Sequence, residues 1–472
     1  MNESLISSES KKQAINVFNN TREKILLIDR RFSEKNGHLL FENTDLYDLS
    51  KKFPTPFYIY SEEEIIRNIT EIKEAFKIYP NTKIFYAAKT CSLIKILKII
   101  KDNGVLAEAN SIYEIMKCIE SGFKGDEIIF NGVLKKRSDL EYAIKNNIYS
   151  INVDSFYELN LIEEISNELQ IEANVSIRIE PNVSSPTHPD CITAYHAKAG
   201  IDLKDAELMC KKIINMPYVN LKGLHIHTGD QIPILEPFSK AVKIIISEAK
   251  RLENLLNIKF KLINLGGGIP VPYKYEKGDP SKDYLYTNIN SSDFANVIID
   301  EVLKWRDDIE VCIEPGRKVV SSAAVLLSTI CCEKFKTNYD DNFNILDIVN
   351  WKFIDAGYSI LPDSLHFNWF YYAFNVKNIT DNYTTFSKIA GPLCDGGDYF
   401  HQGIYKEYFL LPESTTVGDA LAFINVGAYS IESQTIYNNR PRSAVVLITK
   451  EGTTELIRRE DTFSDIIGYD IY

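Results

Sequence analysis

Short apolar segments alternate with amphipathic helical stretches between about residues 83 and 317. Neighbouring parallel strands have to be joined by a crossover, usually a helix, so this alternation is typical of a parallel α/β fold. There are eight strand-like segments: Ile84–Ala87, Val105–Glu108, Ile128–Asn131, Ser150–Val153, Val175–Ile179, Leu221–His227, Leu262–Leu265 and Val311–Glu314. Eight strand–helix units predict an α/β fold of the (β/α)8 barrel type, whose active sites lie where the strands end.

The sequence pattern changes after about residue 335. Short segments rich in Val, Ile and Phe follow, with turn residues between them: Phe343–Val349, Lys352–Ala356, Ala420–Val426, Ser443–Thr449 and Thr454–Arg458. This pattern predicts a mainly antiparallel β domain at the C-terminal end.

Two strand-like segments before the barrel, Leu39–Phe41 and Thr55–Tyr60, are expected to join that β domain and bring the two chain ends together. With 472 residues the chain is long enough for a barrel and a second domain. We therefore expect four parts: a polar N-terminal arm (1–36), joining strands (37–62), the barrel (63–335) and the β domain (336–472).

Composition excludes several other classes of protein. The net charge of -12, without a long basic block, argues against a nucleic-acid partner. No apolar run approaches the roughly 18 residues that a membrane span requires, and Met1–Ser4 lacks the features of a signal peptide. The eight cysteines are scattered without CxxC pairs, so neither a metal site nor a disulfide framework is expected. We expect a cytoplasmic protein with a small-molecule partner.

Lys89 directly follows the strand-like segment Ile84–Ala87 and precedes a helical stretch. Most lysines are solvated surface charges, but this one would lie at the end of a barrel strand. Further chemically active segments follow it: His225–Gln231, Gly266–Gly268, Glu314–Arg317, Cys394–Asp398 and Gly427–Tyr429. Together they supply what a pyridoxal phosphate enzyme needs, namely an amine for a Schiff base, an anion cradle, an acid for the ring nitrogen and a proton donor.

Each of these segments also has a simpler interpretation. Gly266–Gly268 would let the main chain approach a phosphate, although a tight turn also explains three glycines. Arg317 would add a bidentate charge to the phosphate site. Glu314 would keep the pyridine nitrogen protonated, so that the ring can accept electrons. His227 could stack on the ring, or it could be a histidine of the barrel core.

The chain resembles the fold type III pyridoxal phosphate decarboxylases, and among them the diaminopimelate decarboxylases. The resemblance covers about residues 38 to 466. The motifs that carry it are Tyr86–Lys89, Pro181–Val183, Thr187–Pro189, Lys198–Ile201, His225–Gln231, Asn264–Gly268, Glu314–Arg317, Gly391–Cys394, Gly427–Tyr429, Tyr437–Asn438 and Arg440–Arg442. So many motifs in the same order make the resemblance specific.

The resemblance implies a role for each matching residue. Lys89 would hold the cofactor, His227 would stack on it and Glu314 would pair with its nitrogen. Glu108 keeps the carboxylate that the family usually supplies as Asp. The phosphate would be surrounded by Gly267, Gly268, Gly316, Arg317 and Tyr429. Cys394 would come from the β domain of a partner subunit and return a proton after CO2 leaves, so a head-to-tail homodimer with two shared active sites is expected.

The chain departs from the family where the substrate's far end would bind. After Asp355–Gly357 the family places an arginine, then a tyrosine, that grip the distal carboxylate of diaminopimelate. Here Tyr358–His366 contains no arginine, and Asp363 falls near the missing one. Asp395 stands where the family usually has Glu. A buried carboxylate without a cation is unfavourable.

This charge pattern favours a substrate with a distal amine beside Asp363 or Asp395. Arg317 and Tyr429 would complete the contacts with the substrate. We therefore expect a decarboxylase of the D-ornithine or D-lysine type. The alternative is a meso-diaminopimelate decarboxylase that makes L-lysine and uses an arginine from elsewhere.

Three other classes were considered. An amino-acid racemase shares the barrel and its lysine, but the Cys394–Asp395 loop and the length of the β domain argue against it. A non-catalytic protein with this fold would be expected to lack Lys89 or Cys394, and both are present. A phosphate-binding barrel enzyme without pyridoxal would lack a visible absorbance band.

Overall fold

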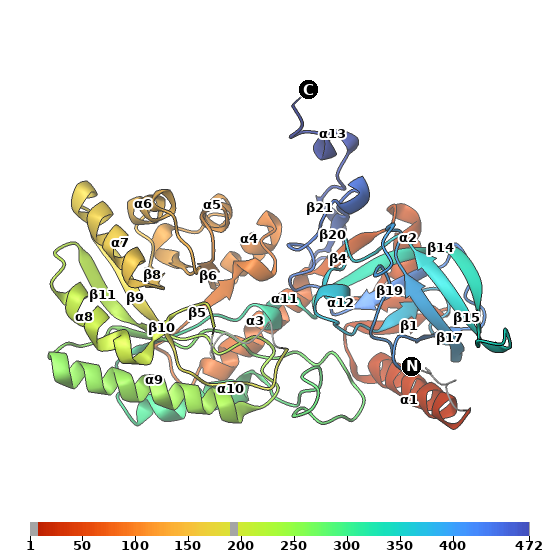
Figure 1. Ribbon diagram of the computed structural model, residues 1–472, viewed down its shortest axis with the longest axis horizontal. Coiled ribbons are helices and arrows are strands. Elements are labelled where there is room, and N and C mark those ends of the chain that lie inside the picture. The colour runs from red at the N-terminus through yellow and green to blue at the C-terminus, as the bar shows by residue number, and fades with distance from the viewer. Residues whose placement is uncertain (1–7, 189–196, 472) are drawn as a thin grey trace. The chain divides into compact units, whose positions relative to one another are not determined.

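The computed structural model describes residues 8–188 and 197–471 and divides them into two compact units (Figure 1). Pro189 of the shared motifs and Cys191 lie outside the described residues. The first unit contains the chain up to residue 64, residues 273–277 and the chain from residue 321. The second contains residues 65–272 and 278–320. It ends before the expected boundary at 335, because strand β14 (Ala324–Tyr339) belongs to the sheet of the first unit.

The second unit is built on a closed ring of parallel strands. In chain order these are β5 (Thr82–Ala87), β6 (Leu106–Ala109), β7 (Ile128–Phe130), β8 (Ser150–Val153), β9 (Ala173–Glu180), β11 (Val219–His225), β12 (Leu262–Asn264) and β13 (Glu310–Ile313). Strand β13 pairs with β5 and β8 pairs with β9, which closes the ring. The expected (β/α)8 barrel is confirmed, and each of the eight strand-like segments overlaps a strand of the ring.

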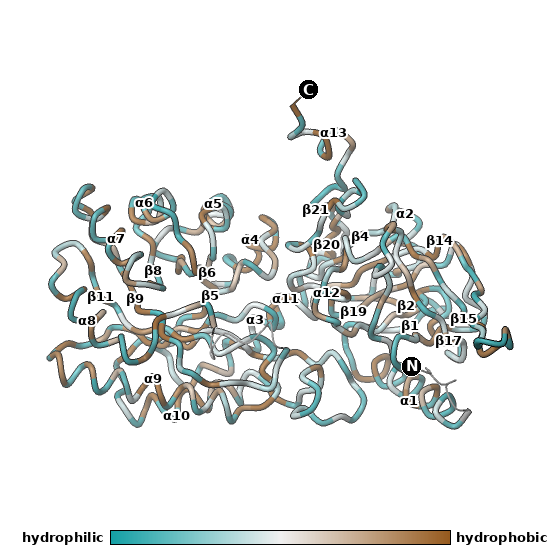
Figure 2. The backbone as a smooth tube through the Cα atoms, viewed as in Figure 1, coloured by the Kyte–Doolittle hydropathy of each residue, from teal (hydrophilic) through white to brown (hydrophobic). Residues whose placement is uncertain are grey.

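Helices surround the ring, as Figure 1 shows. They are α3 (Glu62–Phe76), α4 (Ile94–Asp102), α5 (Ile112–Glu120), α6 (Arg137–Lys145), α7 (Phe156–Leu169), α8 (Ala206–Ile214), α9 (Leu235–Leu256) and α10 (Ser291–Leu303). Helix α9 shows why they form: Phe238, Val242 and Ile246 recur at helical spacing and are buried, which gives one apolar face. Hydrophobic and hydrophilic residues accordingly alternate along α9 and α10 (Figure 2).

Side chains fill the barrel interior. Phe85, Ile129, Tyr149, Leu262 and Cys312 form a buried cluster from five neighbouring parts of the ring. Such layers of side chains make a barrel a packed core and not a pore. The packed interior holds the strand ends in fixed positions, which is what a site built from several strands needs.

The first unit is a mixed, mainly antiparallel sheet, as expected. Its strands are β4 (Phe57–Ser61), β14, β15 (Ile345–Ile354), β16 (Ala373–Asn375), β17 (Tyr383–Ala390), β18 (Phe409–Pro412), β19 (Ala420–Ile424), β20 (Ala444–Ile448) and β21 (Thr454–Arg458). Only the β15–β17 and β4–β20 pairings are parallel. The two segments expected at Phe343–Val349 and Lys352–Ala356 form the single strand β15.

The segments before the barrel have different outcomes. Thr55–Tyr60 is confirmed as part of the sheet, because β4 pairs with β14 and β20. Leu39–Phe41 does not join it: β2 (His38–Phe41) pairs with β1 (Phe32–Lys35) and β3 (Thr44–Asp45) in a separate three-stranded sheet of the same unit. Short segments such as these carry too little pattern to show which sheet they enter.

The N-terminal arm contains helix α1 (Ser8–Ile28), which packs on the first unit. Phe18 is 3% exposed, and its ring centroid lies 5.2 Å from that of Tyr383. Asn19 Nδ2 donates to the Tyr383 carbonyl oxygen at 3.1 Å. The helix is therefore anchored by side-chain contacts.

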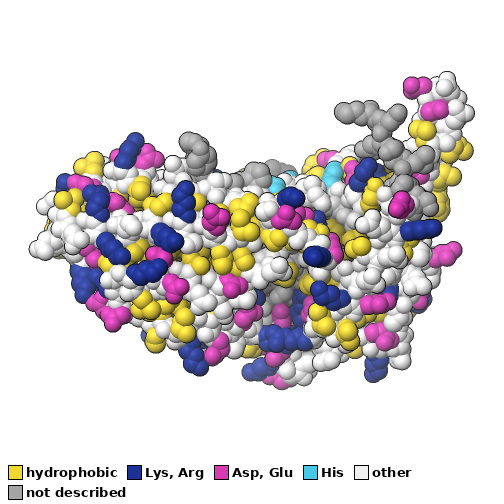
Figure 3. All heavy atoms as spheres, turned by 90° about the horizontal axis from the view of Figure 1, so that it is seen from below, with side chains coloured by type: hydrophobic (Ala, Val, Ile, Leu, Met, Phe, Trp, Pro, Cys, Tyr) yellow, Lys and Arg dark blue, Asp and Glu magenta, His cyan; other side chains and the backbone are white. Residues whose placement is uncertain are grey.

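The surface drawn in Figure 3 carries both signs of charge. On the face drawn in Figure 3, basic and acidic side chains are interspersed, and no broad area carries one sign of charge. No helix within residues 8–188 and 197–471 is long and apolar enough to cross a membrane.

Candidate active site in the barrel

Lys89 lies in a single helical turn, η1 (Ala88–Thr90), directly after β5. The Ala87 amide donates to the Pro315 carbonyl oxygen at 3.1 Å, and Thr90 Oγ1 lies 2.8 Å from the Ala87 carbonyl oxygen. Ala88 and Thr90 are buried while Lys89 is half-buried. The turn therefore fixes the backbone and leaves the lysine side chain accessible at the carboxyl end of the strand.

Glu314 follows β13 at the same end of the barrel and is 5% exposed. It accepts hydrogen bonds from Asn264 Nδ2 at 2.7 Å and Asn131 Nδ2 at 3.0 Å, and His225 Nε2 lies 3.3 Å away. Burial alone would raise the pKa of Glu314, but the hydrogen bonds from His225 and Asn264 outweigh burial and lower it. Glu314 is thus an ionised carboxylate, the form that can hold a proton on a pyridine nitrogen.

His225 ends β11 and His227 follows it, and burial lowers the pKa of both imidazoles. Burial, with the nearby charges of Lys89 and Arg178, lowers the pKa of His227 to about 3. His227 Nδ1 accepts from the Gly267 amide at 3.2 Å, so the ring proton is on Nε2. His227 is half-buried and presents a neutral aromatic ring, as stacking requires, whereas His225 is buried against Glu314.

The three glycines after β12 are required by their surroundings. Gly266 and Gly268 have φ of +66° and +104°, which other residues rarely adopt. A Cβ atom at Gly267 would lie 2.4 Å from the Glu314 carbonyl oxygen. The glycines thus allow this segment of backbone to lie against His227 and Glu314. Nearby, Thr228 Oγ1 is buried and has no hydrogen-bond partner among the described residues.

Arg317 is bound by an acid that the sequence analysis did not assign. It begins α11 (Arg317–Val320) and is 4% exposed. Its Nε donates to Asp230 Oδ2 at 2.9 Å, and its Nη2 donates to the same oxygen. Burial would raise the pKa of Asp230, but Arg317 lowers it. Gly316, just before Arg317, packs against Thr90, since a Cβ there would lie 2.5 Å from Thr90 Cγ2.

A set of polar residues at the strand ends was also missed. Its members lie at or near the carboxyl ends of five barrel strands: Asn131, Asn152, Arg178, His225 and Asn264. A polar residue at the end of each successive barrel strand is a signal that sequence can show, because strand ends meet at one face of a barrel. Asn131 and Asn152 contact Glu108, Glu314 or each other.

The remaining predicted residues belong to the first unit. Cys394 and Asp395 are exposed in the loop after β17. The Cys394 amide donates to Asn438 Oδ1 at 2.8 Å, and Asp395 Oδ2 accepts from Tyr358 OH at 3.0 Å. Tyr429 follows β19 in a left-handed conformation with φ of +67°. The structure thus brings Lys89, Glu108, His227, Gly267, Gly268, Glu314, Gly316 and Arg317 together in the barrel, and Cys394 and Asp395 together in the other unit.

Asp363 does not have the position expected of a substrate contact. It starts the short helix α12 (Asp363–His366) and is 1% exposed. Its Oδ2 lies 3.4 Å from Tyr371 OH, inside the first unit. The sequence places an acid near the position of the missing arginine. In the structure, the Asp363 carboxylate lies in the packed interior of the first unit.

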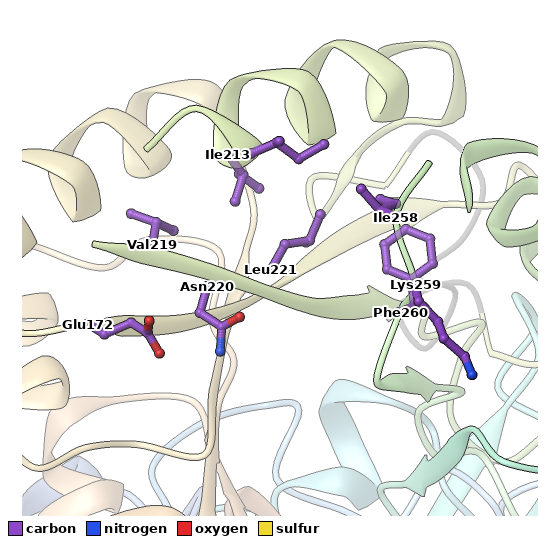
Figure 4. A pocket seen from close by; sticks show the side chains of 9 residues that line it. Glu172, Ile213, Val219, Asn220, Leu221, Ile258, Lys259 and Phe260 are labelled. Carbon is purple, nitrogen blue, oxygen red and sulfur yellow. The ribbon is translucent and has the colours of Figure 1, made fainter. Parts of the chain in front are cut away.

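Two pockets are found at the opposite end of the barrel from Lys89. One, of about 230 Å³, lies between α8 and the beginning of β11, where Ile213, Val219 and Leu221 are near one another (Figure 4). The other, of about 310 Å³, lies beside Thr82 and Leu106, at the beginnings of β5 and β6. In barrels that end contributes to stability and not to catalysis.

The residues at the carboxyl end fit pyridoxal phosphate. An accessible lysine, an ionised and buried carboxylate and a neutral histidine ring lie around one strand-end face. The glycine turn that admits no Cβ and the buried, unpartnered Thr228 hydroxyl suit an anion approached by backbone. Arg317 adds a cation to the same region.

Comparison with known proteins agrees with this geometry. A family model described as the pyridoxal binding domain of pyridoxal-dependent decarboxylases matches residues 62–321. The diaminopimelate decarboxylase of Methanocaldococcus jannaschii is 32% identical over 448 residues, covering 93% of this chain and 96% of that protein. The diaminopimelate decarboxylase of Methanothermobacter thermautotrophicus is 29% identical and covers 91% of this chain and 95% of its own.

The crystal structure of the M. jannaschii diaminopimelate decarboxylase superposes with a TM-score of 0.82, at 32% identity, and covers 94% of this chain and 98% of that one. At this coverage the match extends over both units. This chain therefore belongs to the pyridoxal-dependent decarboxylase family and is a pyridoxal phosphate-dependent carboxy-lyase that acts on an amino acid.

Proposed function

We propose that this decarboxylase converts meso-diaminopimelate to L-lysine and CO2. The observation that carries the proposal is the likeness over nearly the whole chain to diaminopimelate decarboxylases, one of which has a crystal structure described as a co-complex with L-lysine, at 31% identity and a TM-score of 0.82. This puts the alternative of the sequence analysis ahead of the expected D-ornithine or D-lysine activity, which called for an acid at Asp363 or Asp395; Asp363 is buried.

Within the barrel the roles divide by chemistry. When bound, pyridoxal phosphate supplies the electron sink that lets a carboxyl group leave as CO2. Lys89 supplies the amine that anchors it, and Glu314 keeps a proton on the ring nitrogen. His227 offers its neutral ring for stacking. Gly267, Gly268, Gly316 and Arg317 hold the phosphate, and we assign Tyr429 to the same anion site.

We further propose that Cys394 returns the proton to the substrate carbon and that it does so across a homodimer. Cys394 is exposed, and its backbone is held by Asn438, so the loop presents the thiol in a defined place. The exposed Asp395 beside it is fixed by Tyr358. A proton donor on an exposed loop of one copy suits a site completed by a second copy.

The distal carboxylate of diaminopimelate still needs a cation. Arg440 is exposed, and its charge favours the ionised form of Asp398 against the effect of burial on that pKa. Asp398 accepts hydrogen bonds from the amides of Tyr358 and of Leu393, the residue before Cys394. We propose Arg440 as the residue that takes the place of the missing arginine. Asp395 favours a second candidate function. An exposed carboxylate next to Cys394 suits a substrate with a distal amine.

A substrate panel separates the two candidates. The purified protein is incubated with meso-diaminopimelate and with both enantiomers of lysine and of ornithine, and CO2 is measured; Lys89→Ala is the inactive control. We expect meso-diaminopimelate to be preferred and Arg440→Gln to lower its kcat/KM by about 10- to 100-fold. Faster turnover of lysine or ornithine by the unaltered protein, with a loss in Asp395→Asn, would overturn the proposal in favour of the second candidate.

A further inference from the structure

The arginine assigned to the phosphate is already paired with a carboxylate. Arg317 Nε donates to Asp230 Oδ2 at 2.9 Å, and Arg317 Nη2 donates to the same oxygen. The two side chains are 4% and 17% exposed, so water and salt screen their charges little. Burial would raise the pKa of Asp230, but Arg317 lowers it, so the acid is ionised. The guanidinium charge is therefore balanced before any phosphate binds.

The loop that carries Asp230 is fixed to the segment after β12. The Ile232 amide donates to the Gly268 carbonyl oxygen at 3.0 Å. Gln231 Nε2 donates to the Val271 carbonyl oxygen at 2.6 Å, and the Val271 amide donates to Gln231 Oε1 at 3.0 Å. These bonds are made by the two residues directly after Asp230. The acid is therefore held close to the glycines that are assigned to the phosphate.

Two further observations indicate that this loop faces a ligand. Thr228 Oγ1, two residues before Asp230, is buried and has no hydrogen-bond partner among the described residues. The charge of Lys89, the residue assigned to anchor the cofactor, also lowers the pKa of Asp230. The acid therefore lies within the electrostatic field of the lysine as well as that of the arginine.

A phosphate group and the Asp230 carboxylate bring charges of the same sign to one guanidinium. A phosphate monoester carries about two negative charges at neutral pH. Next to Arg317 it gains the attraction of the guanidinium and meets the repulsion of the carboxylate, and both are strong where little water is present. A buried guanidinium without its carboxylate would be an uncompensated charge, which destabilises a folded protein.

We infer, on the assignment of Arg317 to the phosphate proposed above, that Asp230 is the built-in counter-ion of the phosphate site and sets its affinity. Asp230 stabilises Arg317 while the site is empty, and it weakens the binding of the phosphate group. Phosphate and carboxylate thus compete for one guanidinium. The pair favours the folded protein without cofactor, and it makes the cofactor easier to release than a site with the arginine alone would.

Binding of pyridoxal phosphate and of pyridoxal, which lacks the phosphate, to the cofactor-free full chain tests the inference. In Asp230→Asn the side chain keeps its shape and loses its charge. Its Kd for pyridoxal phosphate should fall by about 10- to 100-fold, while its Kd for pyridoxal should change by less than about threefold. An unchanged or higher Kd for pyridoxal phosphate would overturn the inference, and a higher one would show that the carboxylate only orients the arginine.

Asp29→Asn is the matched control. Asp29 forms the same kind of pair with Arg31, whose Nε and Nη2 donate to its two oxygens at 2.9 and 2.6 Å, but both residues belong to the other unit. This variant should change neither Kd. A Kd for pyridoxal phosphate that falls equally in both variants would mean that the effect is not specific to Asp230, and it would overturn the inference.

Thermal unfolding without cofactor tests the other half of the inference. In phosphate-free buffer Asp230→Asn should melt at a lower temperature than the unaltered protein, because its guanidinium has lost its counter-ion. Added inorganic phosphate should raise the melting temperature of Asp230→Asn more than that of the unaltered protein. An equal rise in both proteins would show that phosphate and carboxylate do not compete for the arginine.

Arg317→Gln and the double variant Asp230→Asn/Arg317→Gln give a second test if Asp230→Asn alone does not fold. Without the guanidinium the carboxylate still repels the phosphate, so the double variant should bind pyridoxal phosphate about 10-fold more tightly than Arg317→Gln. Equal or weaker binding by the double variant would overturn the inference. If Arg317→Gln keeps the normal preference for pyridoxal phosphate over pyridoxal, the assignment of Arg317 to the phosphate is wrong and the inference falls with it. None of these measurements uses the amino-acid substrate, so they do not depend on which one the enzyme decarboxylates.

Discussion

The two ends of the barrel both combine lysine with glutamate, but they arrange them differently. At the amino-terminal end, Lys83 Nζ lies 2.8 Å from Glu310 Oε2, and Lys222 Nζ lies 3.7 Å from the centre of the Tyr149 ring. At the carboxyl end, the carboxyl groups of Glu108 and Glu314 are bound by neutral asparagines. Charges that neutralise one another stabilise packing, whereas charges held by neutral amides remain available for chemistry. The Arg317–Asp230 pair lies at the carboxyl end as well, so the comparison concerns these lysines and glutamates alone.

The largest expected difference is in enzyme activity, between substitutions of Lys89 and of Lys83. Lys89→Ala should lower activity by at least about 1000-fold, because the cofactor loses its covalent anchor. Lys83→Ala, the matched variant at the other end, should keep activity within a few-fold. Borohydride reduction followed by peptide mapping should find the cofactor on Lys89. A label on Lys83 or any other lysine would remove the distinction between the ends.

The carboxyl end is expected to be incomplete within one chain. Lys89→Ala and Cys394→Ala should each be nearly inactive alone. Mixed and allowed to exchange subunits, they should recover up to about a quarter of normal activity, because one of the two sites in a mixed dimer is intact. Demonstrated exchange without recovery would show that each site is built by one chain.

Substitutions of Glu314 and Glu310, at opposite ends of the barrel, should differ in activity by a smaller factor than the two lysine substitutions. Glu314→Gln removes the carboxylate that favours a protonated ring nitrogen, so kcat should fall by roughly 10²- to 10³-fold. Glu310→Gln removes the partner of Lys83, so thermal stability should fall while kcat changes little. Thermal unfolding and steady-state kinetics on both variants measure this. Equal losses of kcat would contradict a functional difference between the ends.

The smallest effect concerns pH. The pKa of Glu108 is raised in the folded protein, so its contribution to stability is complete below its unfolded pKa of about 4.5 and is lost as the pH rises toward 8. The pKa of Glu314 is lowered to about 2, so its contribution is present above about 4.5 and is lost as the pH falls toward 2.

Between pH 5 and 9 the melting temperature of Glu108→Gln should therefore rise relative to that of the unaltered protein. Glu310→Gln provides the control for the loss of a glutamate in the same barrel. A constant difference in melting temperature across this range would be inconsistent with a protonated Glu108.

The barrel could be predicted from sequence because each strand is a short apolar run between amphipathic helices. The sheet of the first unit was predicted in outline only. Strands β16 and β18 are three and four residues long, too short to show a period, and β14 follows the barrel without a break in pattern. Pairing over long sequence separations decides such strands, and one sequence does not display it.

The site could be predicted where chemistry requires a rare residue at a strand end, as at Lys89, His227 and Glu314. The asparagines that hold the carboxyl groups were missed because an asparagine near a strand end usually indicates a turn. Asp363 was placed by alignment alone, and its burial depends on packing that the local sequence does not reveal.

The position of β4 has a consequence for how the chain assembles. Its residues precede the whole barrel, yet all are buried between β14 and β20, which follow it. During synthesis β4 therefore has no partner strand until β14 and β20 have been made, after more than half of the chain has left the ribosome. Completion of the first unit is a late event of high contact order, whereas the barrel, continuous along most of its length, can form earlier.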